Sequence, residues 1–76
     1  MIFGIYAIKD QVTGLFGQPF LEQNKAAAVR RFEYVCSKAE MVALDSQLFL
    51  LGTFNQETGE IIYNQQFLQS YVKRDE

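Results

Sequence analysis

The residues that could do chemistry are mostly basic, and they gather in one stretch of the chain. Arg30 and Arg31 are adjacent, and Lys25 and Lys38 lie near the two ends of a segment that is predicted to be helical. Tyr34 falls between these cations, so the five side chains could contact the phosphates and bases of a nucleic acid. The alternative is an ordinary solvated helix face, on which an acidic residue one turn away pairs with an arginine.

Catalytic chemistry is not expected. The sequence has no histidine, which removes the usual general base and the commonest metal ligand. Cys36 is the one cysteine, so it can build no thiolate zinc site, and we expect it to be buried on the apolar side of the helix. The carboxylates are scattered and form no recognisable acid–base pair or metal loop: Asp10, Glu22, Glu33, Glu40, Asp45, Glu57 and Glu60. We therefore expect a protein that is not an enzyme and needs no cofactor and no metal.

Size and charge narrow the class of protein further. The 76 residues predict a single domain, residues 1–76, whose small core would gain stability from a partner. The formal net charge of −2 argues against strong nonspecific binding to duplex DNA, although a local basic patch remains compatible with it. One cysteine allows no intramolecular disulfide, which fits a reducing cytoplasm. No apolar run approaches the roughly 20 residues that span a bilayer, and the first residues lack a basic start and a cleavage site, so no membrane association is expected.

Two strong strands and one helix must position these residues. Residues 2–8 and 48–54 are rich in aromatic and β-branched residues and are apolar on both faces, which predicts two central strands. In the second of them, alternation places Leu48, Leu50 and Phe54 on one face. Residues 24–39 are predicted to form a helix that Asn24 caps. Its apolar stripe at helical spacing consists of Ala28, Val29, Phe32, Val35, Cys36 and Ala39.

The chain contains the same turn pattern twice, as DQVTG at residues 10–14 and as NQETG at residues 55–59. An Asp or Asn that bonds the backbone two residues on, followed by a glycine in the left-handed conformation, is typical of a hairpin turn. We therefore predict return strands at residues 15–20 and 60–64. The first should be short, at an edge of the sheet, or both, because Pro19 cannot donate a hydrogen bond to a ladder. Residues 65–73 carry apolar side chains at helical spacing and predict a short C-terminal helix, while residues 40–47 fit either a helix extension or a packed loop.

These elements predict an α+β fold: a four-stranded antiparallel sheet built from two hairpins in the order ββαββ, with the main helix on one face. The other face would expose an apolar surface that is unusual for a monomer. The candidate dimer or stacking residues are Phe3, Ile5, Tyr6, Phe49, Leu51 and Phe54, and the strand register decides which of them are uncovered. The C-terminal helix could fold over this surface, a second copy could pack on it or extend the sheet into a homodimer, or bases could stack on it.

The chain resembles a known family along most of its length, about residues 4 to 62. It is similar to the small nonstructural protein of gokushoviruses, single-stranded DNA phages of the Microviridae. The motif residues are Tyr6, Ile8, Asp10, Thr13 and Gly14; Asn24, Ala26, Arg30 or Arg31, and Phe32; and Leu48, Gly52, Phe54, Asn55, Thr58, Gly59 and Ile61. Most of these are turn, cap and core positions, and the arginine is the one functional candidate.

The resemblance implies a viral nonstructural protein made in the cytoplasm of the infected bacterial host. It implies a DNA-binding protein that acts in phage DNA replication, either on single-stranded DNA or on the replication complex, during DNA synthesis or packaging. The competing hypothesis from the residues is a dimeric protein-interaction module that modulates a phage or host protein without binding nucleic acid.

Overall fold

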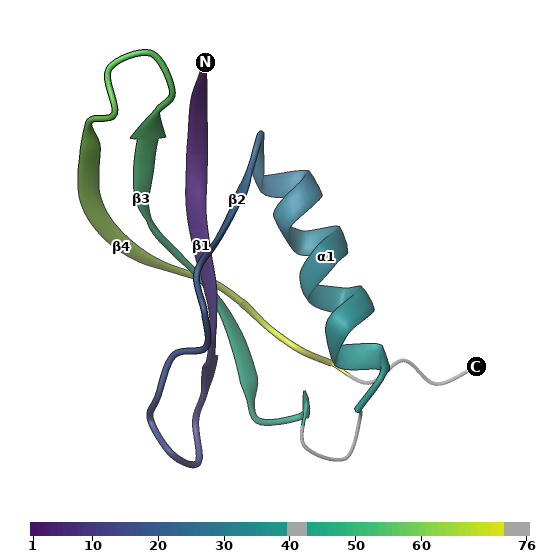
Figure 1. Cartoon of the computed structure of the whole chain (residues 1–76). Coiled ribbons are helices and arrows are strands. Elements are labelled where there is room, and N and C mark those ends of the chain that lie inside the picture. The colour runs from purple at the N-terminus through teal and green to yellow at the C-terminus, as the bar shows by residue number, and fades with distance from the viewer. Residues whose placement is uncertain (40–42, 73–76) are drawn as a thin grey trace.

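The computed structural model describes residues 1–39 and 43–72. These contain the strands β1 (Ile2–Asp10) and β2 (Phe20–Glu22), the helix α1 (Lys25–Ser37), and the strands β3 (Ser46–Asn55) and β4 (Ile61–Ser70). The strands form one antiparallel sheet in the order β2-β1-β3-β4, and α1 lies along one side of it (Figure 1). The predicted α+β fold is confirmed, as is the central position of the two strong strands.

Both hairpin turns are built as the repeated pattern predicts. The amide of Gly14 donates to the carbonyl of Asp10 at 2.8 Å, and that of Gly59 donates to the carbonyl of Asn55 at 2.7 Å. In each turn the first side chain also accepts from the backbone amide two residues on, at 3.0 Å for Asp10 and 2.9 Å for Asn55. The two glycines have φ of 73° and 77°, a region that residues with a Cβ enter only at a cost. The sequence pattern occurs twice because the chain forms the same turn twice.

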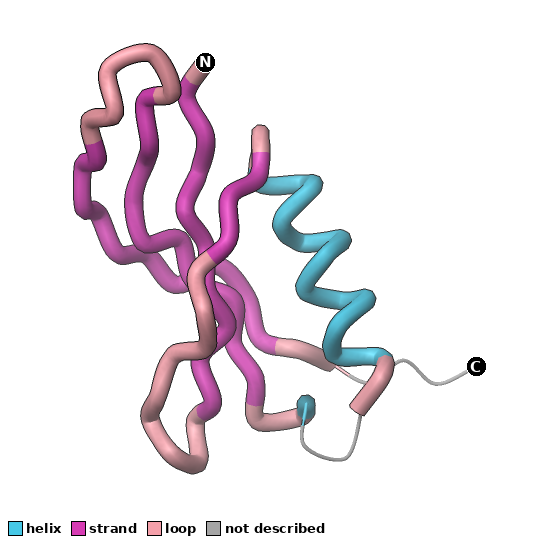
Figure 2. The backbone as a smooth tube through the Cα atoms, in the orientation of Figure 1, coloured by secondary structure: helices cyan, strands magenta, loops and turns pink. Residues whose placement is uncertain are grey.

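The two return strands differ from their predictions. The first is short and lies at the sheet edge, as predicted, but it spans Phe20–Glu22 instead of residues 15–20, and Phe16 contributes only an isolated bridge to Lys9. Pro19 explains this, because proline cannot donate a hydrogen bond to a strand ladder. The second is far longer than residues 60–64, since it runs to Ser70 (Figure 2).

The predicted C-terminal helix at residues 65–73 is wrong for the described part of that range. Residues 65–70 belong to strand β4, where Phe67 pairs with Phe49 and Gln66 with Leu50. The apolar residues do have helical spacing, but this segment pairs with the edge of β3, and that pairing outweighs the local preference for a helix. Residues 40–42 and 73–76, including Glu40, lie outside the described residues.

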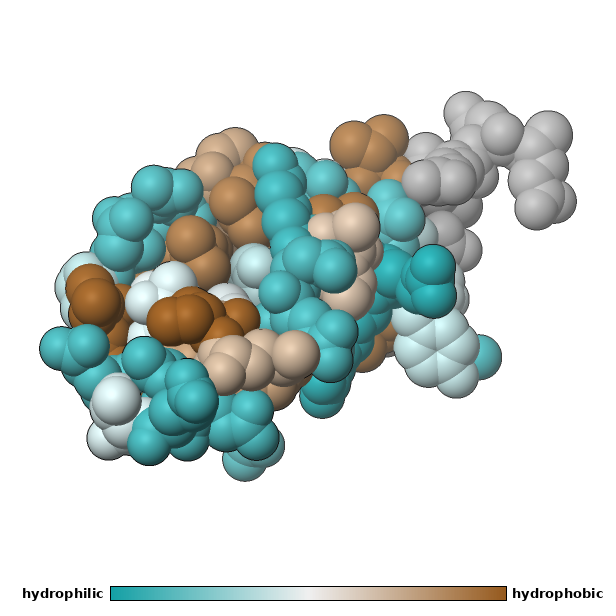
Figure 3. Space-filling model, turned by 90° about the horizontal axis from the view of Figure 1, so that it is seen from above, coloured by the Kyte–Doolittle hydropathy of each residue, from teal (hydrophilic) through white to brown (hydrophobic). Residues whose placement is uncertain are grey.

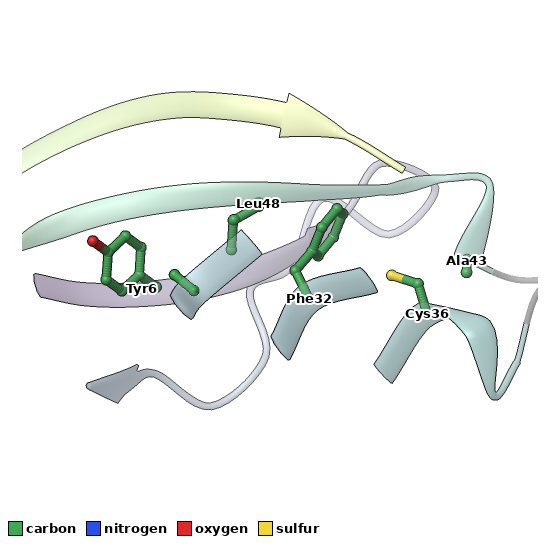
Figure 4. Close-up of a cluster of buried hydrophobic side chains, with 6 residues drawn as sticks. Tyr6, Phe32, Cys36, Ala43 and Leu48 are labelled. Atoms are coloured by element: carbon green, nitrogen blue, oxygen red, sulfur yellow. The ribbon is translucent and has the colours of Figure 1, made fainter. Parts of the chain in front are cut away.

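The core lies between α1 and the helix-facing side of the sheet. Phe32 and Cys36 project from the helix toward the strands, and Leu48 projects toward the helix from β3 (Figure 4). Phe32, Leu48 and Ala28 are fully buried. The side chain of Asn24 accepts a hydrogen bond from the amide of Ala27 at 2.9 Å, which confirms the predicted cap. The helix stripe is narrower than predicted, because Val35 and Ala39 are exposed.

A bulge in β3 changes which side chains share a face. Ile5 pairs with Gly52 and Tyr6 with Leu50, so Leu51 is an extra residue with no partner in either neighbouring strand. Past the bulge, Phe54 pairs with Phe3 and therefore lies on the face opposite Leu50. The predicted grouping of Phe54 with Leu48 and Leu50 is wrong for this reason.

Candidate functional site

The exposed side of α1 carries the basic residues that the sequence singled out. Between Lys25 and Lys38 the chain has four basic residues and one acidic residue, a local charge of +3 in a chain whose net charge is −2. The spacing of Ala27, Arg30, Arg31 and Tyr34 places them on one stripe of the helix. The structure therefore brings two guanidinium groups and a phenol ring together on one surface.

Arg31 is anchored to the neighbouring strand β2. Its Nη1 lies 3.3 Å from Oε2 of Glu22, and its guanidinium carbon lies 4.5 Å from the centroid of the Phe20 ring. Phe20 in turn stacks on Tyr6, with ring centroids 6.0 Å apart. Arg31 thus joins the helix to the sheet edge, and half of its side chain remains exposed.

Arg30 and Tyr34 border a shallow hollow beside this anchor. The hollow has a volume of about 420 Å³ and is lined by Glu22, Ala27, Arg30, Arg31 and Tyr34. Ala27 leaves room at its floor because its side chain is a single methyl group. Arg30 makes no ion pair with any other described residue, so its charge is available to a ligand.

Tyr34 and Lys38 form the end of the basic surface nearest the C-terminus of α1. Tyr34 is 63% exposed, and Nζ of Lys38 lies 4.9 Å from the centroid of its ring. A cation over an exposed ring is a geometry that can accept both a phosphate and a stacked base. Lys25 lies at the other end of the helix, outside the hollow, and is exposed. Four of the five predicted residues therefore lie in α1, Lys38 is its C-cap, and three of the five line the hollow.

The second candidate surface is the side of the sheet away from α1, which we call the open face. Phe3, Ile5, Phe49 and Phe54 lie on it, as their pairing shows, and each is partly buried there. Tyr6 does not: it is 5% exposed and belongs to the core beneath the helix. The prediction that Tyr6 could lie on an uncovered surface is therefore wrong for a single chain.

Sequence reasoning missed several residues of the open face. The paired positions add Leu21 on β2, Ile61, Tyr63 and Phe67 on β4, and Phe16 in the first loop. Phe49 makes edge contacts with Phe16 at 5.3 Å and with Phe67 at 5.6 Å between ring centroids. Ile61 and Tyr63 could have been found from their alternation in the predicted strand at residues 60–64, whereas the prediction of a C-terminal helix obscured Phe67.

The open face carries one described cation. Nζ of Lys9 lies 5.5 Å from the ring centroid of Phe16 and 5.7 Å from that of Phe49. Figure 3 shows apolar side chains exposed at the end of the molecule that the strands form, with hydrophilic side chains around them. One lysine among many rings makes this face apolar rather than basic, in contrast to the exposed side of α1.

Burial shifts the pKa values of two titratable groups in the described core. Burial raises the pKa of the Cys36 thiol above its ordinary value, which a hydrogen bond with Ser46 partly opposes. Burial also raises the pKa of Tyr6, with a smaller contribution from the charge of Glu22. Within residues 1–39 and 43–72, no three His, Cys, Asp or Glu residues come together as a metal site would require. In the same part of the chain, no helix has the length and apolar character needed to cross a membrane.

Comparison with known proteins identifies the family to which the chain belongs. The chain is a phage-encoded accessory protein: the model of the family described as Phage ORF5 protein matches residues 3–73. The chain therefore belongs to the Phage ORF5 protein family. No curated protein and no solved structure matches it.

Proposed function

We propose that this phage protein binds single-stranded DNA, alone or within the phage replication complex, through the exposed side of α1. It is a noncatalytic, nonstructural protein of the gokushovirus type, and it acts in the cytoplasm of the infected bacterial host during DNA synthesis or packaging. The membership of the phage family supports the setting, and the similarity of its motifs to gokushovirus proteins supports the narrower assignment.

The observation that carries this proposal is the local charge of +3 on α1 next to a hollow bordered by Tyr34. Phosphate binding needs cations that are not already paired, and Arg30 meets that condition among the described residues. A flexible single strand can place a phosphate against Arg30 while a neighbouring base stacks on the exposed ring of Tyr34. A rigid duplex offers no unstacked base for this ring, so the geometry favours single strands.

The test is a fluorescence anisotropy titration with a short labelled single-stranded oligonucleotide at two salt concentrations. If Arg30, Lys25 and Lys38 each neutralise one phosphate, affinity falls about 20-fold between roughly 50 and 200 mM salt. Arg30→Ala removes about one contact, so it weakens binding and lowers the salt slope by about 0.7. The double change of Arg30 and Arg31 to Ala weakens binding further.

Lys9→Ala is the matched control, because it removes a cation from the open face and leaves α1 unchanged. The proposal expects it to bind DNA like the unmodified protein. Absence of binding at low salt, or an affinity that the double arginine variant leaves intact, contradicts the proposal. A larger loss from Lys9→Ala than from Arg30→Ala would instead move the DNA site to the open face.

A second candidate function is a protein-interaction module that modulates a phage or host protein without binding nucleic acid. The size of the open face favours it: five of its side chains are 38% to 71% exposed, namely Phe16, Leu21, Ile61, Tyr63 and Phe67. At about 200 Å² for each large side chain, these expose about 540 Å², near the upper end for a monomer. This function predicts no affinity for oligonucleotides at any salt concentration.

A further inference from the structure

Strand β4 is an unprotected edge of the sheet. Residues 61–67 are all exposed, and the ten residues from Ile61 to Ser70 include no charged residue and no proline. Proteins commonly place charges or proline on a long edge strand because its free N–H and C=O groups can pair with another chain. The opposite edge is protected, since β2 is only three residues long, follows Pro19 and packs beside α1.

We propose that β4 pairs in antiparallel fashion with β4 of a second copy of this chain. The two sheets then form one continuous eight-stranded sheet about a twofold axis. In this register Gln65 lies opposite Gln65 of the second copy, and Tyr63 of each copy lies opposite Phe67 of the other. This dimer goes beyond the proposed DNA binding, because it uses a different element and needs no nucleic acid.

The register follows from which side chains share a face. Residues directly opposite each other in a sheet point to the same side, so a continuous open face requires odd positions of β4 to meet odd positions. Centring the pair on Gln65 satisfies this from Tyr63 to Phe67. Beyond Phe67 a register shift at Leu68 places Gln69 on the helix side with Leu48, so the pairing ends there. It also creates two cross-strand pairs between Tyr63 and Phe67, and aromatic pairs are among the favourable cross-strand contacts.

A second copy fits this edge better than a partner of another chemistry. Each chain carries a net charge of −2, so two copies repel unless their contact strands are neutral, and β4 is neutral throughout. The exposed fractions of Ile61, Ile62, Tyr63 and Phe67 correspond to about 490 Å² of side-chain surface per copy at about 200 Å² for each. Two copies thus carry about 1,000 Å² of exposed side-chain surface along this edge, part of which the pairing would bury.

The experiment measures molar mass in solution, by sedimentation or light scattering, on the full chain without DNA. The proposal expects a mass near twice 8.8 kDa at high micromolar concentration. Gln65→Lys and Gln65→Glu each place like charges opposite each other across the twofold axis, so each raises the dissociation constant by up to about fivefold. A mixture of the two variants forms Lys–Glu pairs and recovers the dimer.

Gln23→Lys is the control, because it adds the same charge at an exposed position beside the other edge of the sheet. Tyr63→Ser provides a second variant that weakens the dimer without adding charge, and circular dichroism verifies that each variant keeps its fold. Three results would overturn the proposal: a monomeric unmodified protein, Gln65 variants as dimeric as the Gln23 control, or a charge-swapped mixture that stays monomeric. The DNA titration stands or fails separately, because Gln65 lies on the sheet edge opposite to the one beside α1.

Discussion

Replacing Gly52 with alanine tests the bulge that sets the faces of the sheet. A Cβ at this position would overlap the carbonyl oxygen of Ile62 on the neighbouring strand. Strands β3 and β4 would have to separate there, which removes pairing hydrogen bonds of about 1 kcal/mol each and adds local strain of about 1–3 kcal/mol. We therefore expect a loss of at least about 3 kcal/mol in the free energy of unfolding.

That loss is large against the stability of so small a chain, which is about 4–11 kcal/mol by its length. With a urea dependence of about 1 kcal/mol per molar, the midpoint of urea denaturation falls by about 3 M. Gly17→Ala is the matched control, because its Cβ would meet only the carbonyl oxygen of Ile8 at an ordinary 3.5 Å. We expect this control to stay within about 1 kcal/mol of the unmodified protein. Equal midpoints for the two variants would refute the bulge, and with it the placement of Phe54 on the open face.

Two further predictions concern the turns and the core. Gly14→Ala and Gly59→Ala should each lower the free energy of unfolding, measured by urea denaturation, by about 1–2 kcal/mol. A Cβ at either position meets no atom within 4 Å, so only the positive φ is unfavourable. Losses that differ by more than the experimental error would show that the two turns are not equivalent. Cys36 should react with a thiol reagent at neutral pH far more slowly in the native protein than in urea, because burial raises its pKa and covers it. Because burial raises the thiol pKa, the contribution of the neutral Cys36 thiol to the free energy of unfolding is complete below the ordinary pKa of 9.0. It is lost as pH rises above that value, since the thiol ionises first in the unfolded chain. If the unmodified protein lost no more stability above pH 9.0 than Cys36→Ser does, this prediction would be contradicted.

The parts of the fold that depend on local chemistry could be predicted from the sequence. Asn24 caps a helix wherever the following residues favour one, and the bonds that close the Asp10 and Asn55 turns, from Gly14 to Asp10 and from Gly59 to Asn55, lie within each turn. The two central strands were identifiable because both are rich in aromatic and β-branched residues. These elements needed no knowledge of what lies beside them.

The errors fall where a distant partner decides the structure. Residues 65–70 have a helical pattern, yet the unpaired edge of β3 makes them a strand. Phe54 changes face because one extra residue in β3 has no counterpart in β1, and a bulge of that kind leaves little trace in sequence alternation. The five basic-surface residues could be grouped from the sequence because four of them lie in α1 and Lys38 caps it, whereas the open face draws on four strands and a loop.

The most direct test of the proposed function is an NMR titration of isotope-labelled protein with single-stranded DNA. The account predicts that the largest changes in chemical shift occur at Arg30, Tyr34 and Lys38, and that signals from Phe49 and Phe67 on the open face stay in place. Changes confined to the open face, or no changes at low salt, would contradict the claim that α1 is the DNA-binding surface.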